Sequence, residues 1–430
     1  MNTAIVNGRI VNPAGGTVRD GGVFICGDAI AGIGAAPAGF TAERTIDASG
    51  LTICPGLIDM CARTREPGLE RKATIASETA AAAAGGITAL CCPPDTVPAI
   101  DTPAMAHLVR QRGREAGASR VLPVGALTTG LAGKTITDMA ALADSGCVAI
   151  GNALAPVVNS LVMRRALQYA ATFNLAVILH AEDPWLRGNG CVHEGEVSTR
   201  LGLAAIPATA ETVGVARDLA LIEQTRARAH FGHLSCGRAV AMVAEAQRNG
   251  LPVTAGVTAH HLHLCEEDVG EFDSRCHVIP PLRSRADRRA LREAVQSGVL
   301  SAVCSDHQPH GADAKLVPFG ESEPGISGLE TLLPLVLRLA GEGVADLPAA
   351  LALVTSGPAK ILGLNAGALA PGAPADVCIF DAQKEWTLDA AKMHSRGRNT
   401  PFDGQPMRGK VALTLVGGKI AYRDPAFGAA

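Results

Sequence analysis

The sequence predicts an α/β protein: a (β/α)8 TIM-type barrel joined to a composite β-sandwich that is built from both chain ends. Three observations lead to this prediction. Short apolar strands alternate with Ala-rich amphipathic helices over residues 56–365, a pattern typical of parallel strands with helical crossovers. A segment of that length suits a single barrel. Over residues 1–55 and 366–430 the pattern is β-like throughout.

The two terminal segments are predicted to form one domain. In the first 55 residues apolar and polar positions alternate, and Gly, Asn and Asp interrupt the runs, which indicates short strands and turns. The β pattern returns after Leu364, in GAPADVCIFDA (372–382) and KVALTLVGGKIAYRD (410–424). Each segment is too short to fold well alone, so we expect 1–55 and 366–430 to pack together beside a barrel of residues 56–365.

Within the barrel segment, apolar runs predict the strands and amphipathic stretches predict the helices. MRRALQYAATFN (163–174) and RADRRALREAVQSG (285–298) are two such helices. After a first strand in GLIDM (56–60), the predicted strands are ITALCC (87–92), SRVLPVGAL (119–127), CVAIG (147–151), LAVILHAED (175–183), RAHFGHLS (228–235), LPVTAGVTAHH (251–261) and LSAVCSDHQPH (300–310).

Composition excludes several classes of function. The chain has 38 basic and 41 acidic residues, a net charge of -3 and no Lys/Arg-rich run, so nucleic acid and anionic membranes are not expected partners. No apolar stretch reaches the roughly 18 residues of a membrane helix, and the N-terminus lacks the pattern of a signal peptide. The twelve cysteines include no CxxC pair. We therefore expect free thiols and a cytoplasmic location.

Nine short motifs, in order along the chain, resemble those of the dihydroorotases in the amidohydrolase superfamily. Each motif is weak alone, but their order and spacing are specific. The motifs are PGLIDM (55–60), REPG (65–68), HAED (180–183), GHLS (232–235), VTAHHLHL (257–264), PPLRS (280–284), SDHQPH (305–310), GISGLETLLPL (325–335) and NTPFDG (399–404). The resemblance implies a barrel with one or two metal ions at the carboxyl ends of its strands, and interconversion of carbamoyl-aspartate and dihydroorotate.

Several metal-binding positions that the resemblance implies are occupied by other residues. The family's H-x-H pair, which grips one ion from one face of a strand, is replaced by Cys61 and Arg63. Ala153 stands where a carboxylate or modified lysine is expected. Three further implied ligands remain, and the last of them, an aspartate, would also be the proton shuttle: His180, His233 and Asp306.

The positions that the resemblance assigns to the substrate are changed in part. Arg65, which matches a carboxylate-binding arginine, and His310 are retained. Asp95 replaces an asparagine, and its charge would face the substrate carboxylate; two like charges about 4 Å apart cost roughly 4 kcal/mol at an effective dielectric of 20. Ile279 replaces a second asparagine and cannot form its hydrogen bond.

The altered residues leave structural alternatives open. Cys61 could be an ordinary buried thiol or a soft metal ligand. Arg63 could be a surface charge, but a buried Asp306 without a dication needs a partner, so we expect Arg63 to turn inward and pair with Asp306. His180 and His233 could be ligands or histidines that only hydrogen-bond within the core.

Other histidines and cysteines are expected to have structural roles. In a strand, His261 would face away from His260 and His263, so the three would not form a ligand set. His307 is expected to lie in a loop as polar filler of the former pocket. The segment GNGCVHEGE (188–196) reads as a solvated loop.

Two main hypotheses about function follow. In the first, the chain is a non-catalytic dihydroorotase homologue without a cofactor. The resemblance extends to an inactive branch of the family and implies a homo- and hetero-oligomer with aspartate carbamoyltransferase, in which the barrel protein is a structural partner in pyrimidine biosynthesis.

In the second hypothesis, Cys61, His180, His233 and Asp306 surround one zinc ion. The chain would then be a cyclic amide hydrolase of the hydantoinase or allantoinase type. Residual dihydroorotase activity is a third reading. Bound zinc, and hydrolysis of dihydroorotate, separate the three.

Overall fold

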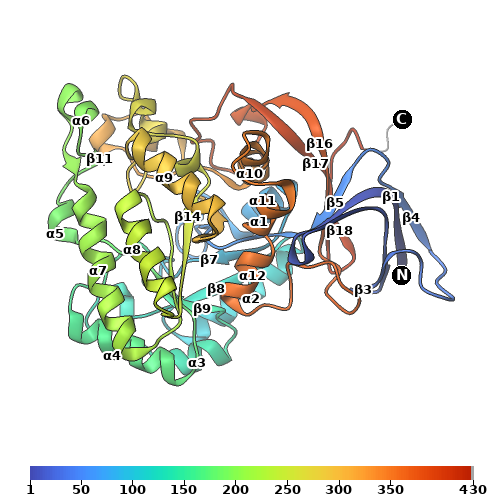
Figure 1. The fold of residues 1–430 in the computed structure, drawn as a ribbon, viewed down its shortest axis with the longest axis horizontal. Coiled ribbons are helices and arrows are strands. Elements are labelled where there is room, and N and C mark those ends of the chain that lie inside the picture. The colour runs from blue at the N-terminus through green and yellow to red at the C-terminus, as the bar shows by residue number, and fades with distance from the viewer. Residues whose placement is uncertain (428–430) are drawn as a thin grey trace.

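The alternating segments in the middle of the chain form a barrel of parallel strands, and the two ends of the chain form a separate sheet (Figure 1). The computed structural model describes residues 1–427, so the last three residues of the predicted 366–430 segment lie outside the described part. The predicted barrel, with an added sheet domain from both chain ends, is confirmed.

Eight barrel strands follow one another in sequence order, and each pairs in parallel with the next. Each is short and apolar, as expected for strands that are buried on both faces. The strands are β6 (Leu57–Asp59), β7 (Ile87–Cys92), β8 (Arg120–Ala126), β9 (Ala149–Gly151), β10 (Val177–Leu179), β13 (Ala229–Phe231), β14 (Val253–Thr258) and β15 (Leu300–Cys304).

The seam between the last strand and the first is closed by side-chain and loop contacts. The backbone N–H of Ser305 donates to Oδ1 of Asp59 at 3.0 Å, and the N–H of Arg63 donates to the carbonyl of His307 at 2.9 Å. Asp59 is completely buried, and burial raises the pKa of its carboxyl to about 6. The loops after β6 and β15 are thereby held side by side.

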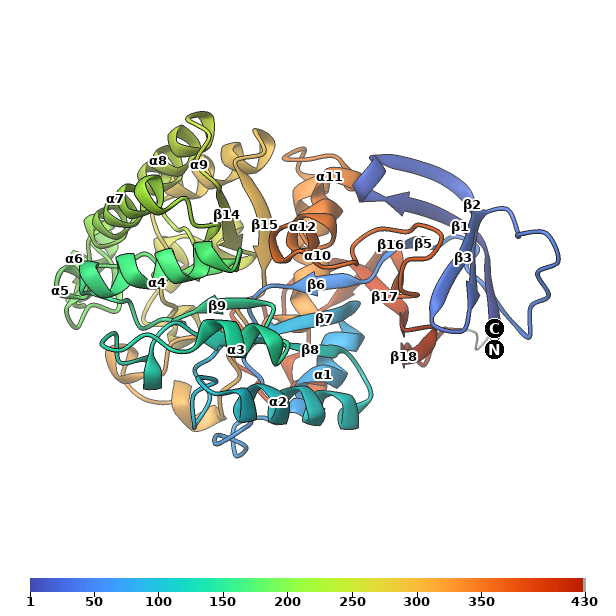
Figure 2. The ribbon, with the colours of Figure 1, turned by 90° about the horizontal axis from the view of Figure 1, so that it is seen from below.

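Helices surround the strands, as Figure 2 shows. Several begin at the residue types that favour helix starts: Thr74, Thr102 and Ser284 each accept a hydrogen bond from the first turn. The helices are α1 (Ile75–Ala84), α2 (Pro103–Ala116), α3 (Met139–Asp144), α4 (Ser160–Thr172), α5 (Pro184–Arg187), α6 (Glu196–Leu201), α7 (Ala208–Thr225), α8 (Gly237–Arg248), α9 (Arg285–Gln296), α10 (Leu332–Gly341), α11 (Leu347–Ala352) and α12 (Ser356–Leu362).

The interior of the barrel is filled by small side chains. One buried cluster among the barrel strands includes Ala89, Cys91, Ala149, Ala302 and Cys304. Residues of α12 join this cluster. Because small side chains fill the lumen, the barrel is a packed core and its chemistry is confined to the strand ends.

The separate sheet is continuous from one chain end to the other. β5 pairs in parallel with β1 and antiparallel with β16, so the strands from the two chain ends join at β5 and β16 to form one eight-stranded sheet. The expected composite domain is therefore built on one continuous sheet with its own apolar core. Its strands are β1 (Asn2–Asn12), β2 (Thr17–Cys26), β3 (Ala29–Gly34), β4 (Arg44–Asp47), β5 (Thr52–Pro55), β16 (Val377–Thr387), β17 (Pro406–Val416) and β18 (Lys419–Arg423).

Two short strands, β11 (Val192–His193) and β12 (Ala205–Ile206), pair outside both sheets, in the excursion between β10 and α7. Among residues 1–427, no helix is both long enough and apolar enough to cross a membrane.

Candidate functional site

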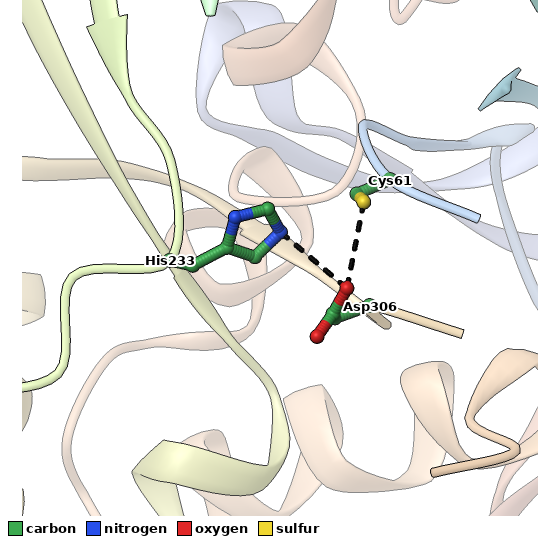
Figure 3. Close-up of side chains that lie close together, drawn as sticks. All are labelled: Cys61, His233 and Asp306. Carbon is green, nitrogen blue, oxygen red and sulfur yellow. Dashed lines mark hydrogen bonds and ion pairs between the residues drawn. The ribbon is translucent and has the colours of Figure 1, made fainter. Parts of the chain in front are cut away.

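Three donor side chains meet at the carboxyl ends of the barrel strands. Cys61, His233 and Asp306 lie in the loops after β6, β13 and β15 (Figure 3). Sγ of Cys61 is 3.5 Å from Oδ1 of Asp306, and Nε2 of His233 is 3.7 Å from the same oxygen. All three are buried, and their donor atoms lie within 4.8 Å of one another. Thiolate, imidazole and carboxylate are all zinc ligands, so these residues form a possible metal site.

A guanidinium group lies beside these donors. Nη1 of Arg63 is 2.9 Å from Oδ1 of Asp306 and 3.8 Å from Sγ of Cys61. Nε of the same arginine is 2.7 Å from Oδ2 of Asp95. The Arg63 side chain is only 4% exposed, so the predicted pairing of Arg63 with Asp306 is confirmed. Asp95, expected to face a substrate carboxylate, is instead the second anion bound by this arginine.

The charged groups that meet at the site are one guanidinium, Arg63, and two carboxylates, Asp306 and Asp95. Burial by itself would raise the pKa of Asp306, but His233 and Arg63 lower it to about 2. Burial also lowers the pKa of His233 to about 4. That imidazole is neutral at pH 7, and Arg63 is then the cation beside Asp306. Burial raises the pKa of the Cys61 thiol well above its usual value, which keeps it protonated.

His180 is not part of the three-residue group. Its Nε2 lies 3.4 Å from Oε2 of Glu182, and that carboxylate also accepts from Nη1 of Arg187 at 3.2 Å. The four-ligand zinc set that was predicted from the sequence is therefore incomplete. Glu182 follows His180 by two residues in the HAED motif. This short spacing is the sequence feature from which the pair could have been predicted.

Two positions that the family uses for polar groups are apolar here. Ala153 lies just beyond β9 and offers only a methyl group. Ile279 is buried in an apolar cluster with Ile206 and Ala210, so its side chain forms no hydrogen bond in the region where an asparagine was expected.

The position of Arg63 opposes a catalytic dication at these donors. A metal ion at Oδ1 of Asp306 would face the Arg63 guanidinium across a buried carboxylate, and two cations in a low-dielectric environment repel strongly. The ring nitrogens of His233 have no hydrogen-bond partner within the described part of the chain. Such orphaned atoms, together with the convergence of the three donor side chains, favour a bound ion.

Little space remains at this end of the barrel. A cavity of about 30 Å³ is bordered by Arg63, Ala153, His180 and His233. This volume holds one or two water molecules, whereas sites for small organic ligands measure about 300–1,000 Å³.

The retained substrate-side residues form a separate cluster. Nη2 of Arg65 is 3.1 Å from Nε2 of His310, and Nε of Arg65 donates to the carbonyl of Pro309. Burial and the neighbouring Arg65 lower the pKa of His310 to about 3. Lys72 and Glu323 form an ion pair beside them. The cationic side chains of this cluster are thus held by protein groups.

The histidines after β14 differ from the prediction. His260 and His261 belong to a 3₁₀ turn, His260–Leu262, and not to a strand, so the expected alternation of faces does not apply. Their ring centroids are 4.7 Å apart. Nε2 of His263 is bound to a backbone carbonyl of α10 at 2.9 Å. The three still provide no common ligand set.

Two residues expected in polar loops have defined structural partners. His307 is fully buried, and its Nε2 lies 2.7 Å from Oε2 of Glu78, so it ties the loop after β15 to α1 and does not fill the pocket. His193 lies in β11, with its Nδ1 3.1 Å from Nη1 of Arg283. Cys191 is 5% exposed. Cys191 and the short strand β11 are therefore not part of a solvated loop, whereas Gly188, Asn189, Glu194 and Glu196 around them are exposed.

The site has an unusual backbone. Within residues 1–427, nine non-glycine residues have positive φ, and Arg65 (62°), Ala153 (50°), His233 (59°) and Asp306 (46°) are four of them. Left-handed conformations of such residues cost about 1–3 kcal/mol each and gather at functional sites. Four of the nine therefore lie at the predicted site residues, as is typical of a functional site.

Comparison of the sequence with known families gives two matches. A dihydro-orotase-like family model matches residues 50–238, and an amidohydrolase family model matches residues 325–422. The chain is 50% identical over 422 residues to a "dihydroorotase-like protein" of Pseudomonas aeruginosa, covering 98% of this chain and 100% of that protein. It is 44% identical over 422 residues to a "dihydroorotase" of Anaeromyxobacter dehalogenans, with 98% of each chain covered.

Solved structures share the fold. An L-hydantoinase from Arthrobacter aurescens superimposes with a TM-score of 0.87 at 22% identity, covering 98% of this chain and 96% of the other. A dihydropyrimidinase from Brevibacillus agri gives a TM-score of 0.84 at 21% identity, covering 100% and 96%. At this identity the likeness concerns the fold alone.

Proposed function

Because the chain belongs to the dihydroorotase-like family of amidohydrolases, we propose that it is a non-catalytic member, retained as a structural partner of aspartate carbamoyltransferase in pyrimidine biosynthesis. One observation carries the proposal. The guanidinium of Arg63 is bound to Asp306, at the position where a hydrolase of this family would hold a dication.

The reaction needs groups that this site lacks. Hydrolysis of a cyclic amide needs a dication, which lowers the pKa of its bound water to about 7 and polarises the carbonyl. It also needs a base whose pKa lies near the working pH. The pKa of Asp306 is about 2, and Gln308 donates to its Oδ2 at 3.1 Å. A carboxylate this acidic and this well bound is a poor proton acceptor.

The substrate side supports the same conclusion. A cavity of about 30 Å³ beside Arg63 does not hold a six-membered ring with a carboxylate. Asp95 is bound to Arg63, so this arginine is not available to a substrate carboxylate. Arg65 and His310 bind each other.

The scaffold is intact, which suits a structural role. The barrel closes through Asp59 and Ser305, Thr74 and Ser284 cap the starts of α1 and α9, and the barrel and the separate sheet each have a buried apolar core. Fold and interface depend on groups remote from the metal site, so they can persist after catalysis is lost. The identity of the partner rests on resemblance to the inactive branch of the family.

A second candidate is a zinc-dependent cyclic amidohydrolase with a rebuilt mononuclear site. The unpartnered ring nitrogens of His233 favour it, together with the nearby Sγ of Cys61 and carboxylate of Asp306. It requires Arg63 to leave Asp306 when the ion binds.

Metal content and turnover distinguish the two. The protein is purified without chelator, zinc is measured by mass spectrometry, and hydrolysis of dihydroorotate and of a hydantoin is followed. We expect far less than one zinc per chain and no turnover. About one zinc per chain that is lost in Cys61→Ser but kept in Cys26→Ser, a change at an exposed cysteine, would establish the second candidate.

The partner is tested separately. The tagged chain is co-expressed with the aspartate carbamoyltransferase of its own organism, and both are followed by size-exclusion chromatography. We expect co-elution, and transferase activity or assembly that depends on this chain. A transferase that assembles and works fully alone, and elutes apart from this chain, would contradict the role.

A further inference from the structure

A second cavity opens at the opposite end of the barrel from Arg63. It measures about 490 Å³ and lies at the amino ends of β10, β13, β14 and β15. Ala176, Arg228 and Pro252 directly precede three of these strands, and Lys360 of α12 borders the opening. We call this space the basal cavity. Its volume falls within the range of small-molecule sites.

The residues around the basal cavity carry only positive charge. Arg228 and Lys360 border it, and no Asp or Glu does. Neither cation has a carboxylate within 4 Å in the part of the chain that the structure describes. Two other cavities of similar size, beside β16 and β17, are both bordered by acidic side chains such as Glu330 and Glu342. The basal cavity is therefore suited to an anion.

Arg228 is held in place before any ligand arrives. Its Nη1 donates to the carbonyl of Asn174 and its Nη2 to the carbonyl of Ile361, each at 3.2 Å. These bonds fix the guanidinium plane without neutralising its charge. The hydroxyl of Ser301 and the amide of Gln247 add polar groups to the lining. Preorganised donors reduce the entropy that is lost on binding.

The lining also restricts the kind of anion. His230, whose Nδ1 is bound to Thr254 at 2.9 Å, is the one ring-bearing residue besides proline among the residues that border the cavity, and none is Phe, Tyr or Trp. A nucleobase would find no wide aromatic surface on which to stack. Burial lowers the pKa of His230 to about 3, so it adds no charge at pH 7.

We propose that the basal cavity binds a compact phosphate-class anion, either free phosphate or the phosphate group of a small non-aromatic metabolite, through Arg228 and Lys360. Guanidinium and ammonium groups form short charge-assisted hydrogen bonds with phosphate oxygens. This site is independent of the proposed assembly role, because it lies at the other end of the barrel from Arg63 and Asp306.

Calorimetric titration tests the proposal with three probes: inorganic phosphate, ribose 5-phosphate and adenosine monophosphate. We expect the first two to bind at millimolar concentration or below. Equal affinity for both would identify the free ion as the ligand, and tighter binding of ribose 5-phosphate would identify a metabolite. Preferential binding of adenosine monophosphate, or binding of no probe, would overturn the proposal.

Variants locate the site. Arg228→Gln should weaken binding about tenfold, as for loss of one strong charge-assisted bond. Lys360→Gln should weaken it about threefold, because Lys360 is exposed and its charge is screened by solvent. Lys384→Gln, on exposed β16, is the matched control and should bind as the parent does. Unchanged binding in both cavity variants would rule the site out.

Hydrogen exchange in the parent protein tests the site even if Arg228→Gln fails to fold. In the parent protein, ribose 5-phosphate should slow exchange in residues 226–230, 251–254 and 357–361. Slowed exchange confined to residues 61–65 and 306–310 would place the anion at Arg65 instead, and would refute the basal site.

Discussion

Nη1 of Arg63 lies 2.9 Å from Oδ1 of Asp306, and the two side chains are 4% and 1% exposed. The charge partner of this aspartate is thus a guanidinium of the same chain. A buried pair of this kind is costly to break, because the charge left behind has no water around it.

Arg63→Gln should destabilise the protein by about 3–5 kcal/mol, since Asp306 and Asp95 both lose their cation. Arg63→Lys retains a charge but reaches only one of the two carboxylates, so its loss should be smaller. Urea denaturation measures both. A change below about 0.5 kcal/mol in Arg63→Gln, typical of an exposed substitution, would show that the pair is not formed.

The same pair predicts a dependence of stability on pH. The folded-state pKa of Asp306 is about 2, below its ordinary value of 3.8. Its carboxylate therefore contributes stability that is fully present above pH 4 and is lost as the pH falls from about 4 to about 2. The loss should be about 2 kcal/mol. Asp306→Asn should abolish this loss of stability between about pH 4 and about pH 2. Asp144→Asn, at an exposed position, should show the same loss as the parent.

Asp59 should change the stability in the opposite direction, and over a higher range of pH. Burial raises its pKa to about 6, so the folded protein binds the extra proton and stability falls as the pH rises from about 4 to about 6. Asp59→Asn should remove this contribution, so the stability of the variant relative to the parent should rise as the pH rises from about 4 to about 6. A difference between variant and parent that does not change with pH in this window would assign the titration to another group, such as Asp218, whose pKa burial also raises to about 6.

Ala153→Gly should stabilise the protein by about 0.5–1 kcal/mol. Ala153 has a φ of 50°, a conformation that glycine adopts without steric cost. Ala155→Gly is the control, because Ala155 is not among the positive-φ residues and should lose stability through added chain entropy. Thermal denaturation compares them. A destabilised Ala153→Gly would mean that the methyl group contributes more by packing than its backbone costs.

Replacing both Cys61 and Arg63 by histidine should give metal binding without catalysis. The C61H/R63H double variant removes the guanidinium and places two nitrogen ligands on one face of the strand end, beside His233 and Asp306. We expect zinc content to rise toward one per chain, with no ring opening, because Ala153 supplies no ligand and the cavity is about 30 Å³. Equal zinc content in parent and double variant would contradict the role given to Arg63.

Much of the fold was predictable because it depends on local pattern. The apolar runs ITALCC and LSAVC became β7 and β15, and the amphipathic segment 285–298 became α9. The shared terminal domain was also predictable, since neither end could bury a core alone. Its continuity as one sheet was not, because the pairing of β5 with both β1 and β16 joins residues far apart in the chain.

By itself, the sequence determined the barrel, the loss of the H-x-H pair and the presence of a buried carboxylate that needs a partner. Which atoms would meet was decided by the tertiary structure. It bound Arg63 to both Asp306 and Asp95, turned His180 toward Glu182, and placed His307 against Glu78. His180 and Glu182 are near neighbours in the HAED motif, but the other pairings join segments far apart in the chain. Burial sets their strength, and both the long-range contacts and the burial are properties of the closed barrel.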